Sequence, residues 1–115
     1  MKGAERDQDL LIYIQESMAR IEKYTLGGRV SFLSEGIVQD AVLRRMETLA
    51  DAASHLSDEL KARHPGIPWR DIHGFRNVAA HGYTEINLQR VWETAEAHLP
   101  ALKVIVDEEI GRGQS

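Results

Sequence analysis

Apolar residues recur at steps of three and four along most of the chain, and this spacing constrains the fold more than any other feature. Leu10, Ile14, Met18 and Ile21 form the first such stripe, which is the pattern of an α-helix with one buried face. No segment of the sequence alternates apolar and polar residues with the period of a strand. We therefore predict an all-α fold, an up-and-down bundle of four to five helices.

Capping and turn residues divide the first half of this pattern into two predicted helices. Asp7 is a candidate N-cap for a helix that runs to about residue 24, and the Gly27-Gly28 pair that follows predicts a turn. Ser34 can cap a second helix that extends to about residue 63. This second helix is predicted to be one long element of the bundle.

The second half of the chain is divided in the same way. His64-Pro65-Gly66 ends the long helix, because proline cannot continue it and glycine suits a C-terminal turn. Pro68 then suits the first position of a new helix. Asn87 is the predicted cap of the last helix, which Pro100 should kink or restart.

Length and composition predict one domain, residues 1–115, large enough for a real core. The absence of cysteine excludes a disulfide framework and a thiolate metal site. The start of the chain lacks the apolar region of a signal peptide, and no apolar run could span a bilayer. We expect a cytoplasmic protein without membrane contact. The net charge of −4 argues against a general nucleic-acid coat, but a cleft can still focus positive potential on RNA.

The stretch of residues 75–83, FRNVAAHGY, carries the most chemistry in the chain. Arg76 offers a fixed fork of donors that suits phosphate, and His81 can move a proton near neutral pH. Asn77 and His81 are four apart and would share one face of a helix. Arg76 and His81 are five apart and point away from each other. Only a long arginine side chain, or a second copy of the segment, would bring both onto one substrate.

Arg76, His81 and Tyr83 form an R-x4-H-x-Y pattern, which resembles the signature of the HepT toxins, a branch of the HEPN ribonuclease superfamily. The match extends from about residue 8 to about residue 105, which would make residues 1–115 a single HepT-like helical domain. Further segments that resemble the family are QDAVLRRM at residues 39–46, IPWRDI at 67–72, Val91-Trp92 and Leu99-Pro100.

The chemistry that fits these residues is RNA cleavage without a metal. His81 would take a proton from a ribose 2′-hydroxyl or give one to the leaving oxygen, while Arg76 would stabilise charge on the phosphate. The resemblance implies a two-fold homodimer whose paired motifs line one cleft, with further assembly left open. Asn77 would orient His81 or the phosphate. Glu47 is the candidate polar residue on the preceding long helix that would orient Arg76 or His81.

The resemblance also implies a partner. HepT toxins are paired with MntA-type nucleotidyltransferase antitoxins, which attach AMP to the tyrosine of this motif, here Tyr83. The added bulk and negative charge would block the phosphate site. Tyr83 could instead close the end of the helix with a hydrogen-bonded hydroxyl, which is compatible with modification.

Several alternatives remain at this stage. Arg76 could form a structural salt bridge with Glu47 or Asp71, and the domain could be a non-catalytic HEPN module that binds a nucleotide or serves as a scaffold for the nucleotidyltransferase. A metal site is not expected, and neither the residues nor the resemblance implies a cofactor. The five histidines, which include no H-E-x-x-H motif or other close ligand pair, are His55, His64, His73, His81 and His98.

Overall fold

A computed structural model describes residues 2–81 and 85–114 of the chain, and in these ranges all regular structure is helical. The predicted all-α class is therefore confirmed. The described residues form seven helical segments rather than four or five. They are α1 (Lys2–Tyr24), α2 (Gly28–Ser34), α3 (Gly36–Ser54), α4 (Asp58–Ala62), α5 (Trp69–His73), α6 (Phe75–Ala80) and α7 (Glu85–Gly113).

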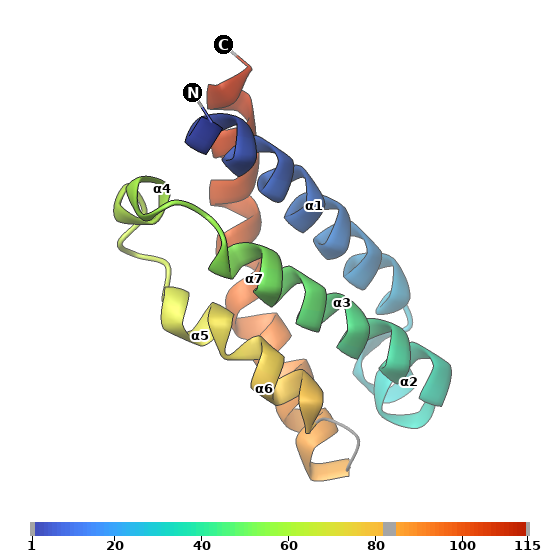
Figure 1. Ribbon diagram of the computed structural model, residues 1–115. Helices are drawn as coiled ribbons and strands as arrows, with labels where there is room; N and C mark the ends of the chain where they lie inside the picture. The colour runs from blue at the N-terminus through green and yellow to red at the C-terminus, as the bar shows by residue number, and fades with distance from the viewer. Residues whose placement is uncertain (1, 82–84, 115) are drawn as a thin grey trace.

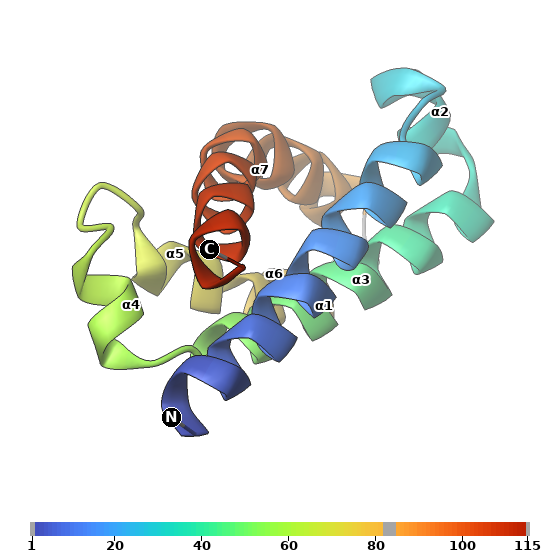
Figure 2. The same cartoon turned by 90° about the horizontal axis from the view of Figure 1, so that it is seen from above.

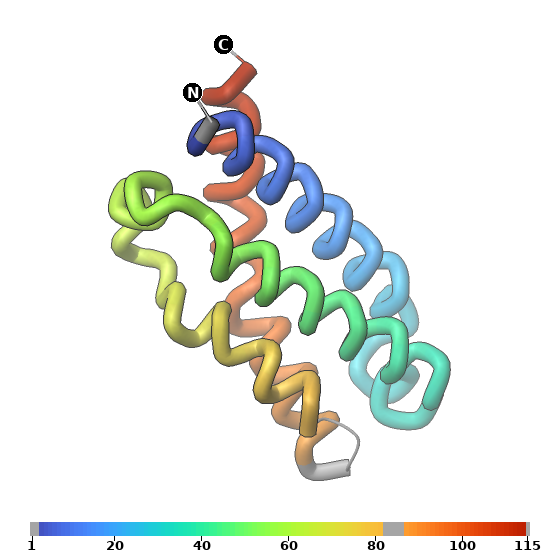
Figure 3. Tube along the Cα trace, in the orientation of Figure 1, coloured from blue at the N-terminus to red at the C-terminus, as the bar shows by residue number. Residues whose placement is uncertain are grey.

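Three long helices, α1, α3 and α7, make the body of the bundle. Helices α1 and α3 run side by side in opposite directions, and α5 and α6 follow the other side of α3 (Figure 1). Helix α7 packs against α1, α2 and α6. The view from above shows α7 on one side of the layer that α1 and α3 form (Figure 2). Residues near the two ends of the chain lie together, far from the end of α6 (Figure 3).

The core lies between these helices and takes one apolar stripe from each of them. The stripe predicted for the first helix is real, since Ile14, Met18 and Ile21 are all buried. No helix in the described ranges is long and apolar enough to cross a membrane. The largest fully buried side chains are Phe32, Phe75, Leu11, Ile14, Met46, Leu49, Leu60, Ile72, Leu102, Val42, Val91 and Val106.

The prediction that Asp7 caps the first helix is wrong. Helix α1 already includes residue 2 and ends at Tyr24, as predicted, so Asp7 lies inside it and is buried. The Asp7 carboxylate accepts hydrogen bonds from the backbone N–H of Ser57, at 2.9 Å, and from its hydroxyl, at 2.6 Å. The side chain of Ser57 in turn accepts from the N–H of Leu60 and caps α4. Asp7 thus supports the cap of a helix fifty residues away.

The predicted second helix, capped by Ser34 and extending to about residue 63, is two helices, α3 and α4, and a further short helix, α2, precedes them. Ser34 ends α2 and its hydroxyl donates back to the carbonyl of Val30, at 2.9 Å, instead of capping a new helix. Glu35 is extended, with φ −113° and ψ 108°, and α3 begins after it. The chain leaves α3 at His55 and starts again at the Ser57 cap. The breaks redirect α2 and α4 toward the ends of the bundle (Figure 1), where one straight helix would extend beyond the core.

The remaining boundaries differ less from expectation. Residues 64–66 separate α4 from α5, as predicted, but Pro68 is the N-cap of α5 and not its first residue. Asn87 lies inside α7 and does not cap it. Helix α7 continues through Pro100 as a single element. Pro100 and Glu96 are both exposed, so water can bind the Glu96 carbonyl that loses its partner.

Candidate functional site

The motif segment is anchored to the core by its apolar residues. Phe75 is fully buried and Ala79 nearly so, and they face α3 and α7 from one side of α6. The ring of Phe75 lies 6.0 Å from that of His98 on α7. Helix α5 is held just before it, because the indole N–H of Trp69 donates to the carbonyls of Lys61 and His64. Packing against α3 and α7 thus fixes the position of α6.

The polar residues of the motif lie on the opposite, solvent-facing side of α6. Arg76, Asn77 and His81 are all exposed. His81 is the residue at which α6 ends, with φ −113° and ψ 14°, and its N–H still donates to the carbonyl of Asn77 at 3.2 Å. Asn77 and His81 are therefore one helical turn apart, as their spacing predicted.

Arg76 lies at a polar groove of about 450 Å³ between α1, α3 and α6. Its Nη1 is 3.8 Å from Oδ1 of Asp51, and both side chains are more than half exposed. Arg44 and Glu47 face the same groove and pair with each other at 3.3 Å. Tyr13 and His55 also line it. The groove therefore holds two arginines and two carboxylates in contact with solvent.

This geometry corrects one expectation about Arg76. Its side chain is 61% exposed. The structural salt bridge was expected with Glu47 or Asp71, but the partner is Asp51. An exposed pair at this distance contributes about 0–1 kcal/mol to folding. The fold therefore gives little reason for an arginine at this position.

The candidate role of Glu47 remains a prediction. Glu47 is on α3, lines the same groove as Arg76 and pairs with Arg44. Asp51, one turn further along α3, is the carboxylate that contacts Arg76. Glu47 does not line the hollow beside His81.

His81 lies at a second, smaller hollow of about 110 Å³. Asn77, Val78, Asn87 and Arg90 complete its lining. The side-chain amide of Asn87 donates a hydrogen bond to the carbonyl oxygen of His81. Arg76 is absent from this lining, so a single chain does not bring Arg76 and His81 into one hollow, which agrees with their spacing of five.

Three residues near the motif were not predicted as site residues, namely Asp51, Asn87 and Arg90. Asn87 and Arg90 come from the start of α7 and reach the motif only because α7 packs against α6. The one available signal was their spacing of three, which places them on a shared helix face. Tyr83, the predicted site of AMP attachment, lies outside the described residues.

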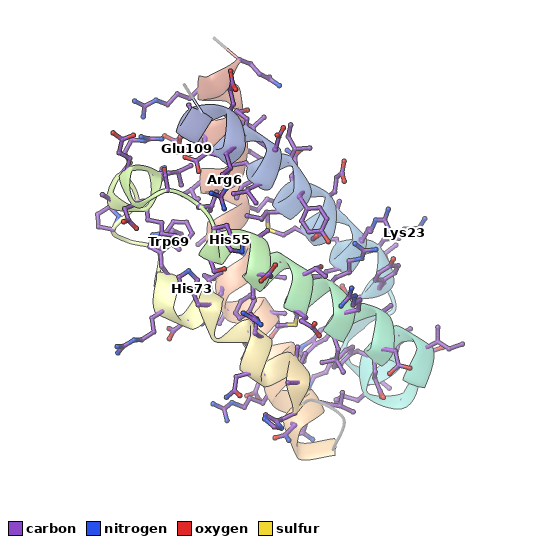
Figure 4. The ribbon with its side chains drawn as sticks, in the orientation of Figure 1. Arg6, Lys23, His55, Trp69, His73 and Glu109 are labelled. Atoms are coloured by element: carbon purple, nitrogen blue, oxygen red, sulfur yellow. The ribbon has the colours of Figure 1, made fainter. Side chains whose placement is uncertain are left out.

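The other histidines are distributed around the fold. No group of three or more His, Asp or Glu side chains in the described part of the chain is arranged to hold a metal ion. His55 and His73 belong to the neighbouring ends of α3 and α5 (Figure 4). Burial, and then the charge of Lys61, lowers the pKa of His73, while a hydrogen bond with the backbone of Ala53 opposes the shift. His73 is thus favoured in its neutral form.

A third hollow, of about 370 Å³, is apolar and separate from the motif. It lies between α1, α2, α3 and α7, and Phe32 and Trp92 contribute to it with ring centroids 5.6 Å apart. Of the predicted site residues, none that the structure describes lines it. Its volume alone therefore does not make it the candidate site.

Known proteins with similar sequences include proteins named as probable or putative ribonucleases. A probable ribonuclease HepT from Thermococcus cleftensis is 31% identical over 84% of this chain and 88% of its own length. “Putative RNase TTE0752” from Caldanaerobacter subterraneus is 28% identical over 83% of this chain and 85% of its own length. “Gamma-glutamylcyclotransferase and putative RNase MJ0434” from Methanocaldococcus jannaschii is 31% identical, and the match covers 45% of that longer protein.

No solved structure matches the chain significantly. The model of one protein family, described as ribonuclease HepT-like, matches residues 14–109. The matched range begins in α1, includes the whole of α2 to α6, and ends near the last turns of α7. The range includes Arg76 and His81, and the chain belongs to the HepT-like ribonuclease family.

Proposed function

We propose that this protein is the toxin of a toxin–antitoxin system and acts as a metal-independent endoribonuclease in the cytoplasm. The observation that carries the proposal is the division of α6 into two faces. Phe75 and Ala79 fill the core, whereas Arg76, Asn77 and His81 are exposed to solvent. Residues that could bind phosphate and move a proton thus lie where a large substrate can reach them. Family membership supports RNA as that substrate.

The proposed reaction needs two proton transfers. A neutral histidine takes the proton of a ribose 2′-hydroxyl, and the 2′-oxygen attacks the adjacent phosphorus. The bond from phosphorus to the 5′-oxygen breaks, and a protonated histidine gives its proton to that leaving oxygen. The products are a 2′,3′-cyclic phosphate and a 5′-hydroxyl end. Arg76 stabilises the negative charge that grows on the phosphate oxygens, and Asn77 orients His81 or the phosphate.

A homodimer supplies the second histidine. Within one chain, Arg76 and His81 line separate hollows, so a cleft that contains both requires a second copy of the motif. We propose a two-fold dimer whose interface includes residues 75–83. Glu47, in the groove of Arg76, is the candidate orienting residue of this composite site. Further assembly of such dimers is compatible with the same interface.

Cleavage assays with the purified protein test this function directly. RNA should be cut in the presence of EDTA and should carry 2′,3′-cyclic phosphate ends. Mass measurement of the dilute protein should give a dimer of the 13.0 kDa chain. Inhibition by EDTA would exclude the metal-independent mechanism, and a protein that is only monomeric would exclude the composite cleft.

We further propose that an MntA-type nucleotidyltransferase neutralises the protein by attaching AMP to Tyr83. The modification adds negative charge and bulk near Arg76 and His81, which would repel and exclude an RNA phosphate. Intact-protein mass spectrometry after co-expression should show the added AMP on the parent chain and none on Tyr83→Phe. The Tyr83→Phe variant, which receives no AMP, should remain toxic. A parent chain that stays unmodified beside an active transferase would leave simple binding as the means of inhibition.

The separation of Arg76 from His81 within one chain also favours a second candidate, a non-catalytic module that binds a nucleotide or serves as a scaffold for the transferase. The two functions differ in their response to substitution. A module of this kind would bind its partner without cutting RNA, and Arg76 and His81 could then be replaced without any effect on RNA.

A further inference from the structure

The hollow beside His81 contains an arginine that does not belong to the motif. Arg90, from the first turns of α7, lines this hollow together with Asn77, His81 and Asn87. Arg76 lines a different groove. Each chain therefore carries a cation of its own next to its histidine, separate from the arginine of the motif.

Packing and one hydrogen bond place Arg90 at this position. The amide of Asn87 donates to the carbonyl of His81 and so connects the start of α7 to the end of α6. Arg90 follows Asn87 by three residues and shares its helix face. Its neighbours Leu88 and Val91 are buried, with 6% and 0% of their surfaces exposed. These contacts fix the rotation of α7 and leave Arg90 on the exposed side, next to the hollow.

The charges around this hollow favour an anion. Its lining, taken from the described residues, consists of two amide side chains, an imidazole, a guanidinium and the half-buried Val78, without a carboxylate. The groove of Arg76 differs, because Glu47 and Asp51 offset its two arginines. Amides, guanidinium and protonated imidazole all donate hydrogen bonds to phosphate oxygens.

The size of the hollow fits one phosphate group better than a whole nucleotide. Its volume of about 110 Å³ corresponds to a few water molecules at about 30 Å³ each. The sugar and base of an RNA nucleotide would then remain outside, over the exposed face of α6. This arrangement suits an enzyme that contacts the backbone of a single strand.

We propose that this hollow binds the RNA phosphate on which His81 acts, and that Arg90 is the arginine that contacts it. The inference rests on the proposed ribonuclease function and adds a residue outside the R-x4-H-x-Y motif to the substrate site. Arg90 holds the phosphate beside His81 of the same chain, and Arg76 of the second copy completes the composite cleft.

Binding and cleavage are measured separately to test this proposal. The binding probe is a single-stranded RNA with 2′-O-methyl groups, which cannot form the cyclic product, and its affinity is measured by fluorescence anisotropy over a range of salt concentrations. Arg90→Ala should reduce the slope of log affinity against log salt by about 0.7, the value for one phosphate contact on a single strand. The kcat/KM for unmodified RNA should fall about 10- to 100-fold.

Arg90→Lys distinguishes charge from the guanidinium fork. It retains the positive charge, so the salt slope should remain that of the parent, while kcat/KM recovers only in part because the two-pronged hydrogen bond is lost. Circular dichroism and melting temperature should be unchanged in both variants, since Arg90 is exposed. A purely structural role would change these two quantities and would not be rescued by charge alone.

Arg29→Ala is the matched control. Arg29 is an exposed arginine that pairs with Glu93 at 3.7 Å and does not line the hollow. The Arg29→Ala substitution removes the same charge as Arg90→Ala and should leave kcat/KM close to that of the parent. If Arg90→Ala and Arg29→Ala behave alike, the inference about Arg90 is overturned. If the parent binds the probe through Arg90 but cuts no RNA, the ribonuclease function fails while the phosphate site stands.

Discussion

The two ends of helix α7 use charge in opposite ways. Near its C-terminal end, the Glu109 side chain is 5% exposed, and Arg63 donates to both of its oxygens at 2.8 and 3.2 Å. His64 contacts the same carboxylate at 2.6 Å, and Figure 4 shows Glu109 at this end of the bundle. Near its N-terminal end, Arg90 faces the exposed hollow of His81. One end of the helix holds a closed ionic cluster, and the other presents donors to solvent.

The electrostatics of Glu109 follow from this closure. The hydrogen bonds from Arg63 lower the pKa of the Glu109 carboxyl, burial opposes this, and His64 adds to the lowering. The hydrogen bond to Glu109 also raises the pKa of Arg63. Gln8 connects α1 to the same turn by donating to the Glu109 carbonyl at 3.0 Å. The comparison indicates that charges at the Glu109 end stabilise the fold, whereas those at the motif end are available to a ligand.

The largest expected effect concerns activity at the motif end. His81→Ala should reduce RNA cleavage by about 10²- to 10⁴-fold, the usual contribution of a proton-transfer residue. The melting temperature should stay within the range of an ordinary surface substitution, because His81 is exposed. Gel assays of cleavage, together with thermal unfolding, measure the two quantities. Retained cleavage would show that the motif end is not the catalytic site.

The opposite result is expected at the Glu109 end. Glu109→Gln removes the charge that Arg63 and His64 contact and should lower the free energy of unfolding by about 2–4 kcal/mol, since one partner of a buried pair is lost. For a domain of this size the melting temperature should fall by about 10 °C. Glu108→Gln, at the exposed neighbouring position, is the control. RNA cleavage well below the melting temperature should be unchanged in both variants.

Arg76 sharpens the comparison, because it has an ion pair but belongs to the motif end. Arg76→Lys should lose most of the cleavage activity, since lysine lacks the guanidinium fork. Its unfolding free energy should change by less than about 1 kcal/mol, as expected for an exposed pair. Asp51→Asn tests the other partner of that pair. If either variant destabilises the protein as much as Glu109→Gln does, Arg76 has a structural role.

The smallest expected effect is the dependence of stability on pH. The pKa of His73 lies below its usual value near 6.5, and that of Glu109 below its usual value near 4.5. For both groups the unfolded chain binds the proton more readily, so acid favours unfolding. Stability should decrease slightly as pH falls below about 6.5 and more steeply below about 4.5. Urea unfolding at several pH values measures this.

Substitution separates the two contributions to this profile. His73→Gln should flatten the decrease that begins below about pH 6.5 without affecting the steeper part below about pH 4.5. A profile that is unchanged by His73→Gln would contradict the assignment of the upper step to His73.

Local patterns in the sequence predicted local features of the structure well. The end of α1 at Tyr24, the separation of α4 from α5 at residues 64–66, and the shared turn of Asn77 and His81 all depend on neighbouring residues. The position of α6 in the bundle could also be anticipated, because Phe75 and Ala79 have the spacing of a buried face.

Features that depend on contacts between residues far apart in the sequence could not be predicted from local patterns. Asp7 has the chemistry of an N-cap, and its real partner, Ser57, is fifty residues away. The break between α3 and α4 at residues 55–57 was not predicted, because the apolar spacing continues on both sides of it. Arg90 reaches His81 only through the packing of α7 on α6. In each of these cases, the pattern identified a suitable residue type but not the residue that it would meet.

The proximity of the two chain ends has a practical consequence for engineering this domain. Gln8 on α1 contacts Glu109 on α7, and the described residues near both ends of the chain lie at the end of the bundle opposite to α6 (Figure 3). A short polar linker could therefore join residue 114 to residue 2, and new termini could be opened in the turn between α1 and α2. In such a circular permutant, a fluorophore or affinity tag at the new termini could be attached without altering the order of residues from α3 to α7.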